Sequence, residues 1–263
     1  MPKAKVNGVE LYYEIMGEGE PVAFLNGILM TTDRWSGETE FLKTKYKCIL
    51  HDTRGQFRSE KPEGDYTMEL HAEDFISLLD HLDIEKCHIV GTSYGGEIGM
   101  IFAYTYPERV KSLSVIGSVS SVDIILHNEI QAWANASKVD LETFMIILRG
   151  IYSEKFLIEN ETYLKQREEL IKKVPEEFFA AFLKLAKAAQ NLDITEKIKN
   201  IKCPTLIICG EDDRITTPRH HRIIADAIPD SELLFVYGAA HALVMEKPDL
   251  IATLLHGFIE RNR

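Results

Sequence analysis

Ser93 lies in residues 91–95, Gly-Thr-Ser-Tyr-Gly, which have the pattern Gly-x-Ser-x-Gly. A short apolar run precedes the pattern and a helix-like apolar segment follows it, so the serine falls in a turn between a strand and a helix. Such a turn holds the serine at positive φ and lifts its hydroxyl above the sheet. The flanking glycines avoid collisions in so tight a turn. This context predicts a nucleophile, and the alternative is a serine that caps an ordinary helix.

Two later segments offer a base and an acid for that serine. The apolar run 205–209 leads into Gly210-Glu211-Asp212-Asp213, and the run 233–236 leads into Gly238-Ala239-Ala240-His241. Each segment places its polar residue just past the end of a strand, where open α/β sheets bind ligands. A serine hydroxyl needs a base, and an imidazole can take its proton and later deliver it to a leaving group. A carboxylate must then orient the imidazole.

The order Ser, Asp, His along the chain is the order of the α/β-hydrolase fold. The chain resembles this family over nearly its whole length, with the middle third the weakest part. Within the family it is similar to the serine-nucleophile branch of 3-oxoadipate enol-lactonases and small carboxylesterases. The resemblance is carried by residues 25–28 (Leu-Asn-Gly-Ile), 52–55 (Asp-Thr-Arg-Gly), 91–95, 107–110 (Pro-Glu-Arg-Val), 210–213, 238–241 and 246–248.

The resemblance also assigns roles to individual residues. The family pattern puts the acid three residues after the glycine at its strand end, which selects Asp213; Asp212 and Asp123 are the alternatives. His241 is then the base. The oxyanion hole is expected to be the backbone N–H groups of Ile28 and Tyr94.

Three features near these residues call for separate interpretation. Asn26 stands where the family usually has histidine, so we expect the support of that loop to differ. Arg54 is expected to form a local ion pair with no catalytic role. His220 and His221 are adjacent, and adjacent residues on a helix point apart, so they cannot chelate a metal together. No metal or organic cofactor is expected.

Composition excludes several classes of function. The chain has 263 residues, of which 45% are hydrophobic and 27% charged, which suits one large α/β domain with a full core. A net charge of −11 argues against nucleic acid and anionic membranes as partners. The four cysteines lack metal or redox spacing and are expected to be reduced thiols. No signal-like apolar segment or run of ~20 apolar residues is seen, so we expect a cytoplasmic protein.

Strand and helix patterns alternate in residues 1–119 and 201–263, which predicts an α/β fold: a mostly parallel sheet with helices on both faces. Residues 120–200 have a single glycine and helical periodicity, which predicts a helical cap inserted in the core. The alternative is a set of helices packed away from Ser93. Arg149 and Lys138 are the cap's candidate cations for a substrate carboxylate. The residues expected to line the substrate pocket are Trp35, which a core position would explain equally well, Trp133, Phe144, Ile147 and Phe178.

These features together predict a serine hydrolase that cleaves a small carboxylic ester or lactone through an acyl-enzyme. The same fold hosts other chemistry, so a C–C lyase or a cofactor-free oxygenase or perhydrolase is an alternative. A ligand sensor that keeps the three residues and an interaction module with a dead site are two more. A small molecule is the expected partner, and the oligomeric state cannot be read from the sequence.

Overall fold

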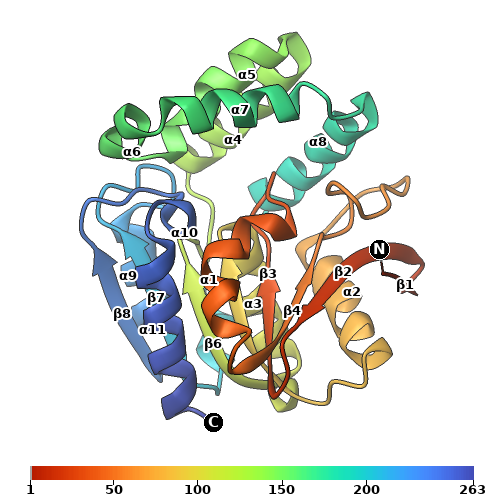
Figure 1. Cartoon of the computed structure of the whole chain (residues 1–263), viewed down its shortest axis with the longest axis vertical. Coiled ribbons are helices and arrows are strands. Elements are labelled where there is room, and N and C mark those ends of the chain that lie inside the picture. The colour runs from red at the N-terminus through yellow and green to blue at the C-terminus, as the bar shows by residue number, and fades with distance from the viewer. Residues whose placement is uncertain (1) are drawn as a thin grey trace.

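The computed structural model describes residues 2–263. Its centre is an eight-stranded sheet with the order β1-β2-β4-β3-β5-β6-β7-β8 (Figure 1). β2 runs antiparallel to β1 and to β4, and the other neighbouring strands are parallel. The expected α/β fold with a mostly parallel sheet is therefore confirmed. The strands are β1 (Lys3–Val6), β2 (Val9–Met16), β3 (Glu20–Leu25), β4 (Tyr46–His51), β5 (Cys87–Thr92), β6 (Val110–Ile116), β7 (Thr205–Gly210) and β8 (Ser231–Val236).

Helices cover both faces of the sheet, which explains why its inner strands are almost continuously apolar. Successive side chains of a strand point to opposite faces, so Val22 and Phe24 of β3 join one core cluster while Ala23 and Leu25 join the other. The first face is covered by α1 (Ser36–Leu42), α10 (Leu243–Glu246) and α11 (Pro248–Arg261). The second is covered by α2 (Met68–His81), α3 (Tyr94–Thr105) and α9 (Pro218–Ala227).

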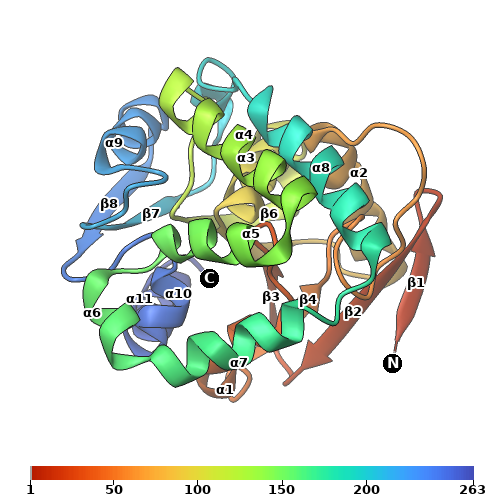
Figure 2. The same ribbon diagram turned by 90° about the horizontal axis from the view of Figure 1, so that it is seen from above.

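A group of helices is inserted between β6 and β7 and lies over the sheet edge at which the parallel strands end (Figures 1 and 2). Its two connections run side by side, because Ser121 and Asp193 form an antiparallel bridge. Asp123, Asp140 and Ser153 each cap the N-terminus of the helix that follows. The inserted helices are α4 (Ile124–Val139), α5 (Leu141–Leu148), α6 (Glu154–Glu159), α7 (Glu161–Ile171) and α8 (Glu176–Gln190).

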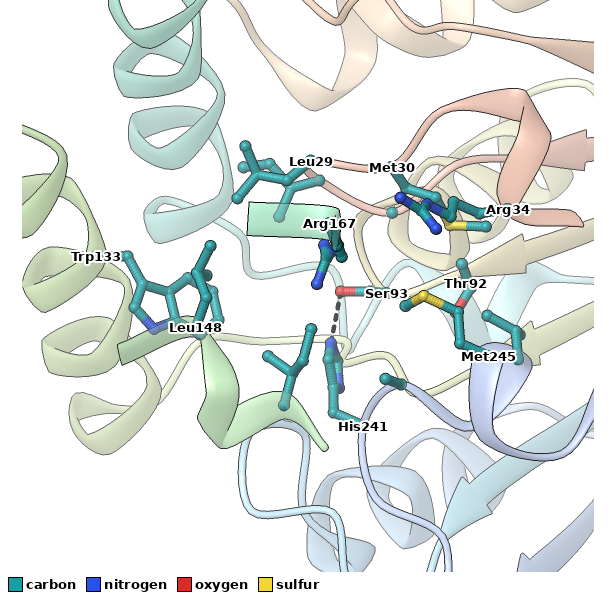
Figure 3. A pocket seen from close by; sticks show the side chains of 15 residues that line it. Leu29, Met30, Arg34, Thr92, Ser93, Trp133, Leu148, Arg167, His241 and Met245 are labelled. Carbon is teal, nitrogen blue, oxygen red and sulfur yellow. Dashed lines mark hydrogen bonds between the residues drawn. The ribbon is translucent and has the colours of Figure 1, made fainter. Parts of the chain in front are cut away.

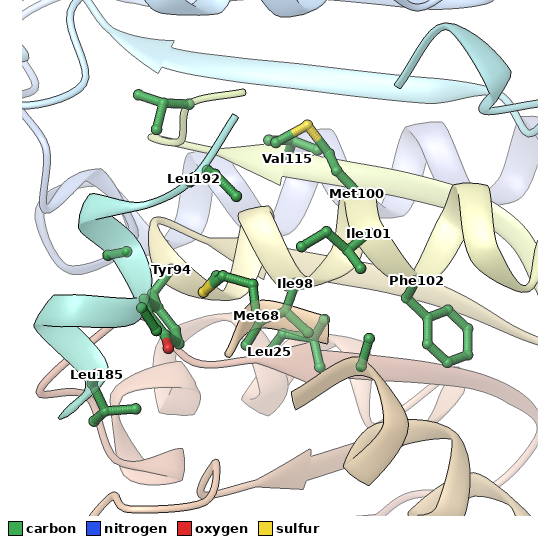
Figure 4. Packing of buried hydrophobic residues seen from close by; sticks show 14 of the residues in the cluster. Leu25, Met68, Tyr94, Ile98, Met100, Ile101, Phe102, Val115, Leu185 and Leu192 are labelled. Atoms are coloured by element: carbon green, nitrogen blue, oxygen red, sulfur yellow. The ribbon is translucent and has the colours of Figure 1, made fainter. Parts of the chain in front are cut away.

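The insertion shares its hydrophobic core with the sheet. Leu185 of α8 and Leu192 belong to the same cluster as Tyr94 and Ile98 of α3, the helix that begins directly after Ser93 (Figure 4). The ring of Phe178 lies 4.8 Å from that of Phe57, centroid to centroid, which ties the start of α8 to the core as well. The segment 120–200 therefore lies against the part of the core that carries Ser93.

Candidate active site

Ser93 occupies a sharp turn between β5 and α3 with φ 51° and ψ −123°. Its own N–H donates to the carbonyl of Ile116 over 2.8 Å, which ties the turn to the neighbouring strand. A Cβ added to Gly91 would lie 2.3 Å from the Gly95 oxygen, and one added to Gly95 would lie 2.1 Å from the Leu25 oxygen. Glycine is required at both positions because the backbone passes too close for any side chain.

Three loops bring a serine, a histidine and an aspartate into one hydrogen-bonded row. Ser93 Oγ lies 3.0 Å from His241 Nε2, and His241 Nδ1 lies 3.0 Å from Asp213 Oδ2. Ser93 follows β5, Asp213 follows β7 and His241 follows β8, so the ends of three parallel strands position the row. Figure 3 shows the contact between Ser93 and His241 at the wall of a pocket.

Asp213 is held as an ionised acceptor. Its Oδ1 accepts the N–H groups of Ile215 and Thr216 at 2.8 and 2.9 Å, and its Oδ2 accepts the Thr216 hydroxyl at 2.7 Å. Burial pushes the pKa of Asp213 upward, but the nearby His241 charge and the hydrogen bonds from His241 and Thr216 outweigh burial and hold it below its ordinary value. The carboxylate is therefore present to orient the imidazole at neutral pH.

The other two candidate carboxylates have different neighbours. Asp212 is exposed and lines a surface hollow with Arg214. Asp123 caps α4 and accepts hydrogen bonds from Arg219 and His220. Of the three carboxylates, Asp213 is the one that the structure brings to His241.

Thr216 is a member of the site that the sequence analysis missed. Besides donating to Asp213, its hydroxyl oxygen lies 3.1 Å from His241 Nδ1. An aspartate commonly bonds the backbone two residues ahead of it, which here is Ile215, and Thr216 follows directly. That spacing is a local signal that could have found it.

Two backbone N–H groups beside Ser93 are free to bind an oxyanion. Within residues 2–263, neither the Ile28 N–H nor the Tyr94 N–H has a hydrogen-bond partner. Ile28, Ser93 and Tyr94 line one common pocket. The carbonyl oxygen of a bound substrate would satisfy both donors, as the expected oxyanion hole requires.

Gln56 holds the loop that presents Ile28. Its side chain accepts the Leu29 N–H at 2.7 Å and donates to the Gly27 carbonyl at 3.2 Å, so it clamps the residues on either side of Ile28. The clamp also holds Leu29 in the left-handed region at φ 61°. Gln56 is fully buried. No local sequence pattern links it to a loop 27 residues away, and the sequence analysis missed it.

Asn26 supports the same loop from the other side, and Trp35 supports Asn26. The Asn26 amide donates to the Met30 carbonyl at 3.1 Å and to Asp52 Oδ1 at 3.3 Å, and its oxygen accepts the Trp35 indole N–H at 2.9 Å. The expectation that Trp35 lines the pocket is therefore wrong. Its ring is fully buried against Phe24, where it packs on the sheet.

Two pockets meet at Ser93. The Met245 pocket, lined by Met245, Met30, Leu148, Ile151, Arg34 and Arg167, also contains His241 (Figure 3). The Glu97 pocket, lined by Glu97, Tyr94, Leu126, Ile130 and Phe182, lies toward α3, α4 and α8. Ile28 and Trp133 line both, so of the expected pocket residues Trp133 is placed as predicted.

The expectation that Phe144, Ile147 and Phe178 line the pocket is wrong. Phe144 packs edge-on against Phe182 and Phe179, and Phe178 packs on Phe57 and Phe179. Ile147 is half-buried against the same cluster. Their apolar helix faces bind neighbouring helices and the core, because several short helices must bury one another before they can line a cavity.

The side chain of Glu97 places a carboxyl group in the mainly apolar wall of the Glu97 pocket. The side chain is 6% exposed, and its Oε2 has no hydrogen-bond partner within residues 2–263. Burial raises the pKa of Glu97 to about 8. It is therefore largely a neutral carboxylic acid at neutral pH, which the sequence analysis did not anticipate.

The expectations for Arg54, His220 and His221 concern residues outside the row formed by Ser93, His241 and Asp213. Arg54 forms a two-pronged ion pair with Asp74 at 2.6 and 2.7 Å, as expected. His221 accepts the Ser118 N–H through Nε2, and His220 contacts Asp123, so each has its own partner. In the part of the chain that the structure describes, no cluster of three or more His, Cys, Asp or Glu side chains could hold a metal.

The sequence of this chain matches the model of the α/β hydrolase fold family over residues 20–166 and 159–248, so the chain belongs to that family. It is 28% identical to a protein of Azorhizobium caulinodans named as a carbamate hydrolase, RutD, over 98% of each chain. It is also 28% identical to 3-oxoadipate enol-lactonase 1 of Acinetobacter baylyi, over 96% of this chain and 94% of that one.

A solved structure that is similar to this chain is also an α/β hydrolase. MGS-M2, an α/β hydrolase enzyme from a Medee basin deep-sea metagenome library, superposes with a TM-score of 0.95 at 28% identity, over 100% of this chain and 98% of its own. The family and these relatives support a hydrolase and confirm the resemblance drawn from the sequence. Separately, no helix within residues 2–263 has both the length and the apolar character needed to cross a membrane.

Proposed function

We propose that this chain is a serine hydrolase that cleaves a small carboxylic ester or lactone. The observation that carries the proposal is the row of contacts at 3.0 Å from Ser93 through His241 to Asp213, beside the unpaired N–H groups of Ile28 and Tyr94. A nucleophile, a base, an orienting acid and two oxyanion donors are what acyl transfer needs.

In the first half-reaction His241 Nε2 takes the proton of Ser93 Oγ as that oxygen attacks the substrate carbonyl. The carbonyl oxygen gains the negative charge and accepts the N–H groups of Ile28 and Tyr94. Asp213 stabilises the imidazolium. When the tetrahedral intermediate collapses, the bond to the alcohol oxygen breaks and His241 returns the proton to that oxygen. An ester releases an alcohol, and a lactone opens while its chain stays attached.

The second half-reaction repeats these steps with water. His241 takes a proton from the water as it attacks the acyl-enzyme, and the same two N–H groups hold the second oxyanion. Collapse breaks the bond to Ser93 Oγ, and His241 returns the proton to the serine. The net change is the addition of one water across the ester bond.

The choice of ester or lactone rests on the pockets and on the enol-lactonase relative. Both pockets that meet at Ser93 have mainly apolar walls, which suits a small organic substrate as the partner. We further propose that residues 1–119 and 201–263 are the catalytic core and that 120–200 is a cap that shapes the pocket. The buried free thiols of the four cysteines favour a cytoplasmic setting.

The proposal is tested by turnover of a panel of p-nitrophenyl esters and lactones by the wild-type chain and by Ser93→Ala. Wild type should hydrolyse members of the panel with multiple turnovers, and Ser93→Ala should lose about 10³-fold or more in kcat, because the serine acts as a unit with His241 and Asp213. A variant with activity within about tenfold of wild type would overturn the proposal. Wild type that acylates once without turnover would point to the ligand sensor instead.

A further inference from the structure

Two guanidinium groups lie in the wall of the Met245 pocket that contains Ser93 (Figure 3). Arg34 belongs to the 3-10 helix Thr32–Trp35 of the core, and Arg167 belongs to α7 of the insertion. Arg167 is only 7% exposed. The two side chains therefore approach one pocket from opposite parts of the fold.

Neither guanidinium has a carboxylate partner within the described residues. Arg34 Nη1 donates to the Tyr163 hydroxyl at 2.7 Å, and Arg167 Nη1 donates to the Tyr152 hydroxyl. Arg149, by contrast, is fully paired on the outside of the insertion, where it contacts Glu168 at 2.6 Å.

Glu246, a carboxylate whose charge acts on Tyr152, already has hydrogen-bond donors of its own. Glu246 accepts the N–H of Ser153 at 3.0 Å and its hydroxyl at 2.5 Å. The hydroxyl groups of Tyr152 and Tyr163 both donate to the sulfur of Met245, at 4.0 and 3.9 Å. Within residues 2–263, the two guanidinium groups therefore contact tyrosine hydroxyls and rings but no carboxylate.

A buried charge without a partner is costly, so a group such as Arg167 is normally paired; Arg34 beside the same pocket is partly buried. A guanidinium carries five N–H donors in a planar fork, and each of these two arginines uses one donor on a tyrosine. The fork matches a carboxylate or a phosphate, which can accept two parallel hydrogen bonds from it. A chain with a net charge of −11 has carboxylates in excess, yet none reaches this pocket as a partner.

We propose that Arg34 and Arg167 form an anion subsite, and that the substrate cleaved at Ser93 is an ester or lactone bearing an oxyanionic group. This rests on the proposed function. Leu148, Ile151 and Met245 form apolar wall in the same pocket, so a short aliphatic segment suits the space between the anion and the scissile bond. Half-esters of short dicarboxylic acids have this chemistry. A phosphate-bearing ester is the other source of the same anion chemistry.

The test compares two substrates that differ by one charge: the p-nitrophenyl half-ester of glutaric acid and its neutral methyl ester. Wild type should prefer the charged substrate at least tenfold in kcat/KM. Arg34→Gln and Arg167→Gln should each lower this preference about 10- to 100-fold, the range for one lost charge-assisted hydrogen bond. Arg149→Gln removes the same charge from the outside of the insertion and should leave the preference unchanged.

Two further measurements distinguish the loss of the anion subsite from a folding defect in the variants. Arg167→Lys keeps the charge but loses the fork, so its preference should fall between wild type and Arg167→Gln. Calorimetry on Ser93→Ala protein should show binding of glutarate that is lost when Arg167→Gln is added. Inorganic phosphate that binds more tightly than glutarate through the same arginines would assign the subsite to a phosphate-bearing ester.

The subsite is overturned if the two p-nitrophenyl substrates are cleaved equally well and Arg34→Gln leaves their ratio unchanged. In that case ester hydrolysis at Ser93 still stands. If no ester is cleaved and glutarate still binds Ser93→Ala through Arg34 and Arg167, the hydrolase proposal fails and the anion site remains. The two failures are therefore separate observations.

Discussion

The indole N–H of Trp35 donates to Asn26 Oδ1 over 2.9 Å, and both side chains are fully buried. Asn26 in turn donates to the Met30 carbonyl at 3.1 Å, so one side chain closes the loop that carries Ile28. The position that usually holds histidine in this family is thus filled by an amide whose partners are supplied by Trp35 and the loop itself. The pair is part of the scaffold of the proposed oxyanion hole.

Trp35→Phe should destabilise the protein without altering its substrate profile. The ring would still pack on Phe24, but Asn26 Oδ1 would lose its donor, at a cost of about 1–3 kcal/mol in the free energy of unfolding. Trp133→Phe is the matched variant, because Trp133 lines both pockets. Chemical denaturation and an ester chain-length series should separate the two: Trp133→Phe shifts the preferred chain length and Trp35→Phe does not. A shifted profile for Trp35→Phe would place that residue at the pocket after all.

Gln56→Leu should lower kcat more than it raises KM. The substitution leaves the buried Leu29 N–H without its partner, removes one of the two hydrogen bonds that the Gly27 carbonyl accepts, and frees the Ile28 N–H between them to move. Removing one oxyanion donor outright costs about 10²–10³ in kcat, so a misplaced donor should cost about 10- to 100-fold. Steady-state kinetics on a p-nitrophenyl ester checks this, with a melting curve to show that the variant is folded. A kcat within twofold of wild type would mean that the loop does not need the clamp.

Glu97→Gln should stabilise the protein increasingly as the pH rises. Burial raises the pKa of Glu97 from 4.5 to about 8, so the folded state holds this proton more tightly than the unfolded chain does. The resulting stability is fully present below about pH 4.5 and is lost as the pH rises toward 8. Glu97→Gln does not ionise, so its advantage over wild type should grow by up to about 1.4 kcal/mol per pH unit across that window.

Urea denaturation at pH 5, 6, 7 and 8 measures this difference. Glu108→Gln, which removes an exposed carboxylate just after α3, is the control and should track wild type at every pH. An advantage of Glu97→Gln that stays constant from pH 5 to 8 would show that the folded state holds the Glu97 proton no more tightly than the unfolded chain does, so that burial does not raise its pKa.

The fold and the row of three residues could be predicted because their signals are local. Ser93, Asp213 and His241 each follow directly on an apolar strand run, and parallel strands bring such positions to one edge of the sheet. The glycines around Ser93 are likewise fixed by contacts within the turn itself and with the adjoining strand. Short-range patterns were therefore enough to predict that Ser93, Asp213 and His241 lie together.

The supports and the pocket could not be predicted in the same way. Gln56 and Trp35 act on the Ile28 loop through buried side-chain bonds between separate segments, and no periodicity records such pairs. Helical spacing showed that α5 and α8 have apolar faces, but not what each face contacts, so Phe144 and Phe178 were misplaced. Arg167 stayed unnoticed because a single arginine in a polar helix has no distinguishing sequence pattern.

The most direct test of the central claim is the mass of the protein after reaction with a fluorophosphonate, followed by peptide mapping. A serine activated by His241 and Asp213 should be phosphonylated once, on Ser93, because the reagent needs both a nucleophile and an oxyanion site. His241→Ala should label far more slowly, and denatured protein should not label. A single adduct on Ser93 is the predicted result. No adduct on native protein, or one on another residue, would contradict the assignment of Ser93 as the nucleophile.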